Sequence, residues 1–403
     1  MATCESPTIG AKQIGKLESR FSIDLFLNKR RGLTRHTLVL KIAMNFDFEK
    51  TLGIIGGGQL SKMLLASAHK WGLKTHVLTG SLTDPAALLA HKVTKASISD
   101  SKAINQWVKK CDFVTIESEF ADLSSIKSKK IAPSPKNLGL FRDRLTQKNL
   151  LLDYKIPTSP FVKLSDLQIY KSPMVFKKRL FGYDGYGTAI IKNKKTFSDF
   201  LKNESKLDDW IAEDFIPFKK ELAVSIARNS ENDFCVLPLV ETMQKDSKCF
   251  WVKGPVKNKK ISAIIKKAQT MMTELNYIGL LTFELFELNG GELMVNEVAP
   301  RVHNSAHYSI EALPLSQFDI HLMAVLNQNL PKKIEPFSYF SMVNLIGTSE
   351  IKPKITTGSS TSLHWYGKSD NRKGRKMGHI TALSKTSKKA LDIALKEEKR
   401  QKL

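Results

Sequence analysis

The sequence predicts a mixed α/β fold, and three features carry this prediction. Residues 51–78 read as a strand, a glycine turn, a helix and a second strand, which is how a parallel sheet begins. Residues 280–295 read as two strands joined at Asn289-Gly290-Gly291, which is typical of an antiparallel hairpin. The chain has 403 residues, enough for roughly two or three domains. Parallel and antiparallel sheets are therefore expected in different parts of one chain.

The N-terminal sheet is predicted element by element. An apolar strand over 51–58 ends in glycines, residues 60–71 have helical spacing of apolar side chains, and 73–78 form the next strand. Phe113-Val114-Thr115-Ile116 adds a further strand, and the unit is expected to end near Pro133-Ser134-Pro135. A dinucleotide site is not expected here, because the glycines lack GxGxxG spacing and no acid follows the second strand.

A nucleotide module is predicted next along the chain. A helix over 145–151 ends before Ile156-Pro157-Thr158, a proline break typical of a domain junction. The apolar strand Met174-Val175-Phe176-Lys177 ends in a lysine, and a loop with three glycines follows over 179–187. Such a loop can fold over a triphosphate, since glycine permits close approach of the backbone. The alternative is a loop that only turns the chain.

Two acids of the hairpin are candidate metal ligands. If the hairpin loop has two residues, paired positions sum to an odd number, and Glu284 lies beside Glu297. A three-residue loop would break that pairing. Two adjacent carboxylates repel unless a cation sits between them, and Mg²⁺ prefers carboxylates together with phosphate oxygens and water. The alternative is a solvated pair of strand glutamates. The stretch Asn296–Ser305 contains Glu297 together with an arginine, a histidine and an amide, which together form a catalytic inventory.

These segments resemble the ATP-grasp enzymes and, in more detail, the N5-carboxyaminoimidazole ribonucleotide synthetase family. The resemblance covers roughly residues 50–385, and its specificity comes from the order of the motifs. The matching motifs, in chain order, are 53–60, 143–148, 182–185, 296–305, 366–368 and 374–379.

The resemblance implies an ATP-grasp fold with an N-terminal parallel-sheet pre-ATP-grasp domain and a small C-terminal β-rich domain. The expected boundaries are an extension over 1–43, the pre-ATP-grasp domain over 44–148, the ATP-grasp domain over 149–335 with a lid at about 149–215, and the C-terminal domain over 336–403. The implied reaction is ATP-dependent carboxylation of 5-aminoimidazole ribonucleotide with bicarbonate through carboxyphosphate, in purine biosynthesis. ATP and Mg²⁺ are the implied cofactors.

The resemblance also assigns site residues. Catalytic roles fall on Arg301, His303, Asn304 and Asp184. ATP binding falls on Arg144, Lys148, Lys177, Gly182, Tyr183, Asp184, Gly185, Gly187, Glu213, Asp214, Phe215, Ile216, Glu221, Gln244, Asn296 and Glu297. Within that set, Lys148 and Lys177 resemble the lysines that clamp the phosphates, residues 210–216 the strand whose backbone reads adenine, and Glu221 the acid that holds the ribose. Substrate binding falls on Gln59, Glu117, Glu119, Lys368 and Arg375, with Glu117 and Glu119 expected on one strand face. The metal ligands are Glu284 and Glu297.

The chain departs from the family pattern at three positions. Tyr186 stands where lysine or arginine is usual, Thr188 where glutamine is usual, and Gln244 where histidine is usual. Two of these changes remove a possible positive charge near the phosphates, and Lys178 and Lys245 are the neighbours expected to compensate. Because of these departures, two other readings stay open: a different ATP-grasp carboxylate-amine ligase, and a non-catalytic nucleotide-binding protein on the same scaffold.

Composition excludes several classes of protein. The net charge of +24 is spread along the chain without a nucleic-acid-binding motif, so no specific nucleic-acid partner is expected. No apolar run reaches the roughly 20 residues that cross a bilayer, and the four scattered cysteines form no zinc or disulfide pattern. We expect a soluble cytoplasmic homodimer.

Residues 1–43 match nothing in the family, so Met44 is the expected initiator; a basic targeting peptide is the alternative.

Overall fold

The structure is a computed structural model that describes residues 21–22, 43–44, 47, 49–182, 185–348, 353–356 and 358–403. The chain divides into two compact units, Met1–Asp47 and Phe48–Leu403. In the first unit, strands β1 (Phe21–Ser22) and β2 (Ala43–Met44) pair antiparallel. The expectations for residues 1–43 otherwise fall outside the described residues. All further elements belong to the second unit.

The N-terminal part of the second unit contains the predicted parallel sheet, with strand order β5-β4-β3-β6. Its strands are β3 (Thr51–Ile55), β4 (Lys74–Thr79), β5 (Lys92–Lys95) and β6 (Phe113–Ile116), and its helices are α1 (Gln59–Lys70) and α2 (Ser101–Val108). Trp107 of α2 packs with Ile55 and Ile116 in one buried cluster. The edge strand β5 was not predicted, because Lys-Val-Thr-Lys lacks both an apolar run and a buried face.

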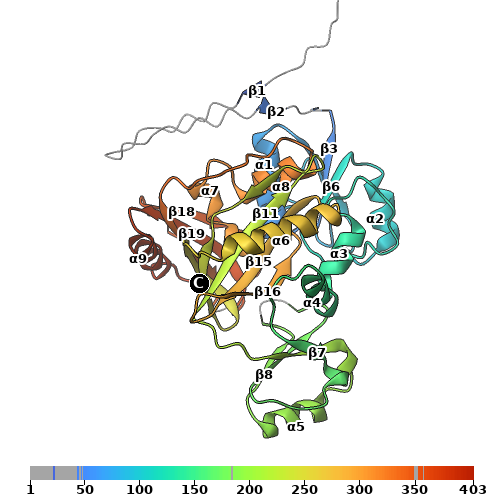
Figure 1. The fold of residues 1–403 in the computed structure, drawn as a ribbon. Helices are drawn as coiled ribbons and strands as arrows, with labels where there is room; N and C mark the ends of the chain where they lie inside the picture. The colour runs from blue at the N-terminus through green and yellow to red at the C-terminus, as the bar shows by residue number, and fades with distance from the viewer. Residues whose placement is uncertain are drawn as a thin grey trace, which may run out of the picture. The chain divides into compact units, whose positions relative to one another are not determined.

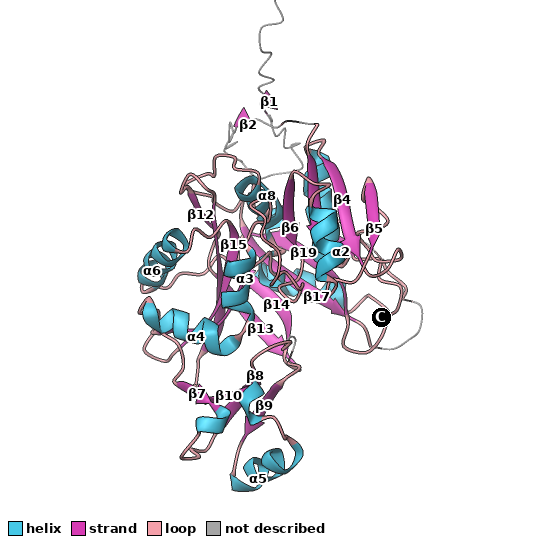
Figure 2. Cartoon of the chain, turned by 90° about the vertical axis from the view of Figure 1, so that its right-hand side faces the viewer, coloured by secondary structure: helices cyan, strands magenta, loops and turns pink. Residues whose placement is uncertain are grey.

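A second, antiparallel sheet follows, with strand order β7-β10-β8-β9 (Figure 2). It comprises β7 (Phe161–Lys163), β8 (Met174–Lys178), β9 (Thr188–Ile191) and β10 (Trp210–Asp214), with helix α5 (Lys194–Asn203) and the 3-10 turns η1 (Leu164–Asp166) and η2 (Leu207–Asp209). Phe176 contacts Phe197 and Phe200 of α5 edge to face, and Phe200 in turn contacts Trp210. This small aromatic core is separate from the core of the largest sheet.

The largest sheet has nine strands in the order β16-β15-β11-β13-β14-β17-β19-β18, with β12 on β11. These strands are β11 (Lys220–Arg228), β12 (Phe234–Val236), β13 (Val240–Lys245), β14 (Lys248–Gly254), β15 (Gly279–Glu287), β16 (Leu293–Ala299), β17 (Tyr339–Ile346), β18 (Thr361–Trp365) and β19 (Lys376–Ser384). The C-terminal strands thus continue the sheet through the pairing of β14 with β17. Helix α9 (Ser387–Glu398) packs on β17 and β19.

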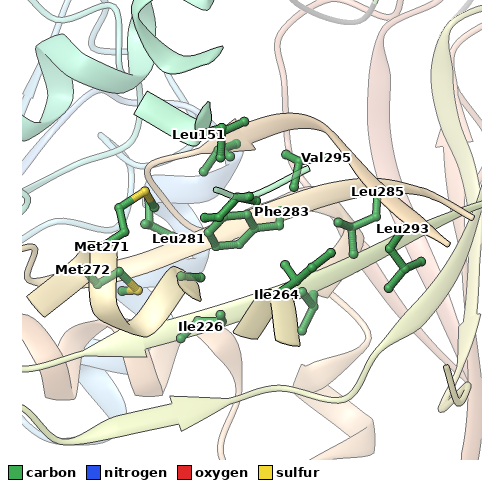
Figure 3. Close-up of a cluster of buried hydrophobic side chains, with 14 of the residues drawn as sticks. Leu151, Ile226, Ile264, Met271, Met272, Leu281, Phe283, Leu285, Leu293 and Val295 are labelled. Carbon is green, nitrogen blue, oxygen red and sulfur yellow. The ribbon is translucent and has the colours of Figure 1, made fainter. Parts of the chain in front are cut away.

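Helices cover this sheet and connect it to the others (Figure 1). They are α3 (Pro135–Arg142), α4 (Arg144–Asp153), α6 (Ile261–Glu274), α7 (Ser309–Ala312) and α8 (Gln317–Val325), with η3 (Asn304–Ala306) before α7. In the main core, Met271 and Met272 of α6 share one buried cluster with Leu281 and Phe283 of β15 (Figure 3). One face of β15 and β16 is buried in this core, so polar residues of alternate positions face the other side. The predicted mixed fold, with parallel and antiparallel sheets, is confirmed.

Candidate active site

One cavity of about 990 Å³ gathers most of the predicted site residues. Its walls come from the carboxyl end of β6, the β7–β10 sheet, the polar face of β11, β15 and β16, and the loop between β18 and β19. The predicted residues that line it are Gln59, Glu117, Glu119, Arg144, Lys177, Gly182, Gly185, Glu213, Asp214, Phe215, Ile216, Glu221, Gln244, Glu284, Asn296, Glu297, Arg301, His303, Asn304, Lys368 and Arg375. Lys148 and Gly187 lie outside the lining, and Tyr183 and Asp184 lie outside the described residues.

Lys148 and Lys177, predicted as a phosphate clamp, share one buried acid. The Nζ atom of Lys148 lies 3.1 Å from Glu213 Oε2, and that of Lys177 lies 3.1 Å from Glu213 Oε1. Lys148 also donates to Thr158 and Ser159 at 2.8 Å, which uses its three N–H groups. Its side chain is therefore held beneath the cavity. Lys177, which also donates to Asn296 Oδ1 at 2.8 Å, is the lysine that reaches the cavity wall.

Burial acts on the pKa values of Lys148 and Glu213 in the group that they form with Lys177. It lowers the pKa of Lys148 to about 8, although Glu213 acts in the opposite direction. Burial alone would raise the pKa of Glu213, but Lys177 and Lys148 outweigh it and hold that pKa below its ordinary value. At neutral pH the three side chains together carry one net positive charge, presented at the cavity by Lys177.

Glu284 and Glu297 face each other across β15 and β16, as predicted, but for a different reason. Leu288 N–H donates to Glu292 O, so the loop has three residues, and Glu287 pairs with Leu293 in the even-sum register that this loop dictates. A bulge between Glu284 and Leu285 then shifts the register by one, and Glu284 pairs with Glu297. The assumption of a two-residue loop was wrong, and the bulge restores the pairing.

The two carboxylates differ in charge state. Burial, with Glu297 and Glu221 nearby, raises the pKa of Glu284 to about 7. Burial acts on Glu297 too, but Arg144 Nη2 at 2.9 Å from Glu297 Oε2 outweighs it and lowers the pKa of Glu297. Arg144 is itself fixed by carbonyl oxygens of Lys178 and Gly182, and a Cβ at Gly182 would overlap its guanidinium. The glycine loop therefore approaches Arg144 only because residue 182 has no side chain.

The segment after β16 brings three predicted catalytic residues to the cavity. Arg301 binds Glu119 through Nε and, at 3.0 Å, through Nη2, so it is already paired with an acid. The Ser305 backbone N–H donates to His303 Nδ1, so neutral His303 carries its proton on Nε2, which lies 3.5 Å from Glu284 Oε1. Asn304 exchanges two hydrogen bonds with the buried amide of Asn344, at 2.7 and 3.0 Å, which holds its orientation.

Glu117 and Glu119 lie in the loop beyond β6, so the expectation that they share one strand face was wrong. Glu117 accepts hydrogen bonds from the backbone N–H groups of Gly58 at 2.5 Å and Leu60 at 3.1 Å. It thus caps the N-terminus of α1, where the helix dipole favours a negative charge. Gln59, the first residue of α1, lines the cavity beside it.

The predicted C-terminal hairpin forms, with His364 opposite His379 in the pairing of β18 and β19. Its loop brings Lys368 and Arg375 to the cavity wall. Lys368 Nζ donates to the Lys376 carbonyl at 2.7 Å, and Arg375 forms an ion pair with Asp370 of the same loop. Both predicted phosphate anchors are therefore held by groups within the loop.

Several cavity residues were not predicted. Phe218 stacks on Phe286 with ring centroids 4.5 Å apart, and Val175 lies opposite Ile190 in neighbouring strands. These apolar side chains form a wall suited to a flat ring. Phe286 was recognisable, since it lies two residues after Glu284 on one strand and therefore on the same face. The full set of unpredicted lining residues is Leu60, Ser118, Phe120, Val175, Ile190, Phe218, Ser247, Lys248, Cys249, Phe286 and Lys373.

The three departures from the family pattern all lie on the cavity wall. The expected compensating lysines are directed elsewhere: Lys178 Nζ lies over the Trp210 ring and Lys245 Nζ over the Phe250 ring, each 5.4 Å from the centroid. Lys248, which lines the cavity, is placed to supply positive charge instead. The Gln244 backbone N–H donates to Glu221, whose pKa burial raises to about 7.

The fold and the cavity define a nucleotide-binding ligase scaffold, and comparison with known families agrees. Residues 150–318 match the ATP-grasp domain, residues 49–141 the ribonucleotide synthetase preATP-grasp domain, and residues 341–392 the phosphoribosylaminoimidazole carboxylase C-terminal domain. No helix in the described part of the chain is long and apolar enough to cross a membrane.

Comparison with individual relatives identifies the family within this class of ligases. The N5-carboxyaminoimidazole ribonucleotide synthase of Staphylococcus aureus strain MRSA252 is 35% identical over 357 residues, which cover 85% of this chain and 95% of that protein. A crystal structure of the S. aureus synthetase with ADP matches with a TM-score of 0.80 and 32% identity, over 88% of this chain and 98% of that one. The Aspergillus clavatus enzyme in complex with ADP and 5-aminoimidazole ribonucleotide matches with a TM-score of 0.75 and 28% identity, over 87% and 99%. The chain belongs to the N5-carboxyaminoimidazole ribonucleotide synthetase family of ATP-grasp ligases.

Proposed function

We propose that the chain carboxylates the amino group of 5-aminoimidazole ribonucleotide, using bicarbonate and ATP. The observation that carries the proposal is the single cavity in which a lysine-acid group, a pair of facing glutamates, the Arg301–Asn304 segment and a basic hairpin loop meet. Each supplies a different requirement of the reaction: phosphate binding, cation binding, bicarbonate binding and ribonucleotide binding. Relatives of 28–35% identity carry the same named activity.

The nucleotide is proposed to bind between the β7–β10 sheet and β11. Val175, Ile190 and Phe286 offer apolar surface to adenine, and Glu221 lies where a carboxylate would accept hydrogen bonds from ribose hydroxyls. Lys177 presents the net positive charge of the buried lysine-acid group to the phosphates. Lys148 acts through Glu213, by neutralising an acid that would otherwise repel them.

Glu284 and Glu297 have the donor set that suits Mg²⁺, because both are oxygen ligands that face each other at the cavity. Burial, together with repulsion from Glu297 and Glu221, raises the pKa of Glu284, and a bound cation would favour its ionised form. When bound at Glu284 and Glu297, Mg²⁺ would supply positive charge that neutralises the phosphates during transfer. Arg144 holds the Glu297 carboxylate ionised and in position.

The chemistry has two balanced steps. A bicarbonate oxygen attacks the terminal phosphorus of ATP, giving carboxyphosphate and ADP. The amine of the ribonucleotide then captures the carboxyl carbon, the bond to phosphate breaks, and one proton is lost. Arg301, oriented by Glu119, supplies charge-assisted donors where the bicarbonate and its phosphorylated form would lie. Gly182 and Gly185 line the cavity, and closure of the glycine loop to which they belong would exclude water from this labile intermediate.

The test is phosphate release from ATP by the purified chain. Release is expected only when bicarbonate and 5-aminoimidazole ribonucleotide are both present, with the carboxyamino product formed in equal amount. Omission of either compound is the control. Release with a different acid and amine would show another ligase, and nucleotide binding without release under any condition would show a non-catalytic protein.

The domain boundaries, the homodimer and the cytoplasmic location expected from the sequence are part of the same proposal. Light scattering on the purified chain measures its mass directly. A mass near 90 kDa, about twice the chain mass of 45.3 kDa, is expected.

A further inference from the structure

A compact group of metal-binding side chains lies where the β18–β19 hairpin meets α7, away from the cavity. His364 lies opposite His379, and their rings stack 4.6 Å apart with an interplanar angle of 14°. His364 Nε2 lies 2.6 Å from Glu311 Oε1. One potential ligand atom from each of the three residues lies within 4.8 Å of the other two. None of the three lines the cavity described above.

Two buried atoms of this group have unmet hydrogen-bonding capacity. Neither His379 Nε2 nor Glu311 Oε2 has a hydrogen-bond partner within the described part of the chain, and His379 is 0% exposed. The other nitrogen of His379, Nδ1, is 3.0 Å from the Tyr366 hydroxyl. If Nδ1 carries the proton toward that hydroxyl, Nε2 offers a lone pair. A buried polar atom without a partner destabilises the folded state, so both atoms favour a positively charged or proton-donating ligand.

We propose that Glu311, His364 and His379 bind a divalent transition-metal ion of the zinc class. Imidazole nitrogens together with a carboxylate suit Zn²⁺, whereas Mg²⁺ prefers oxygen ligands alone. With its proton on Nδ1, toward the Tyr366 hydroxyl, His379 offers the unpartnered Nε2 atom as a metal ligand. Tyr366 fixes the His379 ring from the outer side, as partners of metal-binding histidines commonly do.

To close on an ion, the His364 ring must turn out of its stack on His379, because two nearly parallel rings hold their lone pairs in separate planes. Ligand atoms on one tetrahedral zinc ion lie about 3.3–3.5 Å apart, given bonds of about 2.0–2.1 Å. The His364 side chain is 30% exposed at the edge of the group, so it has room to move and gives an ion a way in. Binding replaces the proton shared by His364 and Glu311. Three protein ligands leave a fourth position for water.

An ion bound between α7 and the hairpin would affect two segments that line the cavity. α7 follows the segment that carries Arg301 and His303, and the hairpin carries Arg375 to the cavity. An ion held by residues of both elements would tie these two substrate-facing segments together. The inference does not depend on the proposed reaction, because metal binding is measured without substrates.

The test uses the untagged full chain, freed of metal with a chelator and then titrated with Zn²⁺ or Co²⁺. Bound zinc is measured by elemental analysis after desalting, and cobalt by its visible absorption. His364→Gln and Glu311→Gln preserve side-chain bulk at partly exposed positions. His91→Gln, at an exposed histidine outside the group, is the matched control.

We expect one zinc ion per chain in the unsubstituted protein and in His91→Gln, with a rise in melting temperature. Affinity should fall at least about tenfold in both His364→Gln and Glu311→Gln. A cobalt spectrum of tetrahedral type should appear only in the first two proteins. Substoichiometric zinc in the unsubstituted protein, or equal affinity in His364→Gln, would overturn the proposal and leave a water molecule as the occupant. Circular dichroism of each metal-free variant checks that it is folded.

Discussion

Asn296 is the extra residue that places Glu297 opposite Glu284. Val295 pairs with Leu285 and Glu297 with Glu284, so Asn296 has no partner of its own in the register of β15 and β16. Val295 and Val298 remain in the core on either side of it. Because of this bulge, two consecutive side chains face the cavity, where a regular strand would present only one.

The side chains of Asn296 and Glu297 bind different partners. Asn296 Oδ1 accepts from Lys177 Nζ, and Glu297 Oε2 accepts from Arg144 Nη2. One irregularity in a hairpin therefore connects the proposed phosphate-binding lysine with the proposed metal-binding acids. A bulge next to an active site commonly re-aims a side chain in this way.

Glu297→Gln tests the proposed metal pair. The change removes a charge where ATP phosphates and metal would meet, so kcat should fall by about 10²- to 10³-fold, as when one transition-state contact is lost. Affinity for the ribonucleotide, measured by calorimetry, should change little. Glu292→Gln in the turn of the same hairpin is the control, since Glu292 is exposed and pairs only with Lys260 among the described residues. Similar losses in both variants would contradict the assignment.

Arg375→Ala tests the proposed phosphate anchor. A hydrogen bond to a charged group contributes about 1.5–3 kcal/mol, so KM for the ribonucleotide should rise roughly 10- to 100-fold. KM for ATP should be unchanged, which separates this variant from Glu297→Gln. Steady-state kinetics with each substrate varied in turn gives both values. A rise in KM for ATP instead would place Arg375 at the nucleotide.

Asp370→Asn provides an opposite test of the same loop. Asp370 forms an ion pair with Arg375 and competes with a phosphate for its guanidinium. The neutral amide should therefore lower KM for the ribonucleotide, or leave it unchanged if the loop loses order. Asp392→Asn, at an exposed acid outside the cavity lining, controls for the same change of net charge. An increase in KM comparable with that of Arg375→Ala would show that Asp370 orients the arginine for the phosphate.

The fold was predictable where local pattern and tertiary environment agree. The strand 113–116 was predicted with the bounds that the structure has, and the predicted helix 60–71 differs from α1 by one residue at each end. Strand β5 was not predicted, because it forms through pairing with β4 rather than through the strand preference of its own residues. The bulge at Asn296 was missed as well, because a register shift depends on packing of Val295 and Val298 and has no signal in residue spacing.

The site was predictable as a set of residues but not as a set of contacts. Charged residues in ordered motifs indicated which side chains meet, and most of them do line one cavity. The motifs did not indicate which of these residues form ion pairs with one another. Lys148 pairs with Glu213 beneath the cavity, and Arg301 pairs with Glu119. The motifs did not indicate the apolar wall around Phe218, since an aromatic residue in a loop more often packs in a core than lines a site.

Lys148→Met tests the role of the buried lysine. The change leaves Glu213 buried with one cation instead of two, so the free energy of unfolding should fall by about 3–5 kcal/mol. Adding Glu213→Gln removes the unbalanced acid and should restore more than half of that loss. Lys163→Met breaks a pair with the exposed Asp208 and should change the free energy of unfolding little. Denaturant unfolding of these proteins and of Glu213→Gln alone, five in all, measures these differences, and an additive double variant would contradict the coupling.

The last prediction concerns acid stability and rests on a buried histidine. His321 is 0% exposed, accepts from the Leu280 N–H through Nδ1 at 3.1 Å, and lies 2.7 Å from Thr115 Oγ1 through Nε2. Both contacts fit the neutral ring with its proton on Nε2. Burial lowers the pKa of His321 from 6.5 to about 4. Burial likewise lowers the pKa values of His307 and His379, and their effects on stability have the same sign.

Between pH 6.5 and 4 the unfolded chain binds a proton at position 321 and the folded chain does not, so the folded state loses stability as the pH falls. For His321 alone the loss reaches about 3 kcal/mol between pH 7.5 and pH 4. His321→Gln should be less stable at neutral pH, because its hydrogen bonds are disturbed, yet should lose less stability on acidification. The exposed His91→Gln should follow the unsubstituted protein. Unfolding by urea at pH 7.5, 6, 5 and 4.5 measures the slopes, and equal slopes for His321→Gln and the unsubstituted chain would mean that the buried ring is protonated in the folded state.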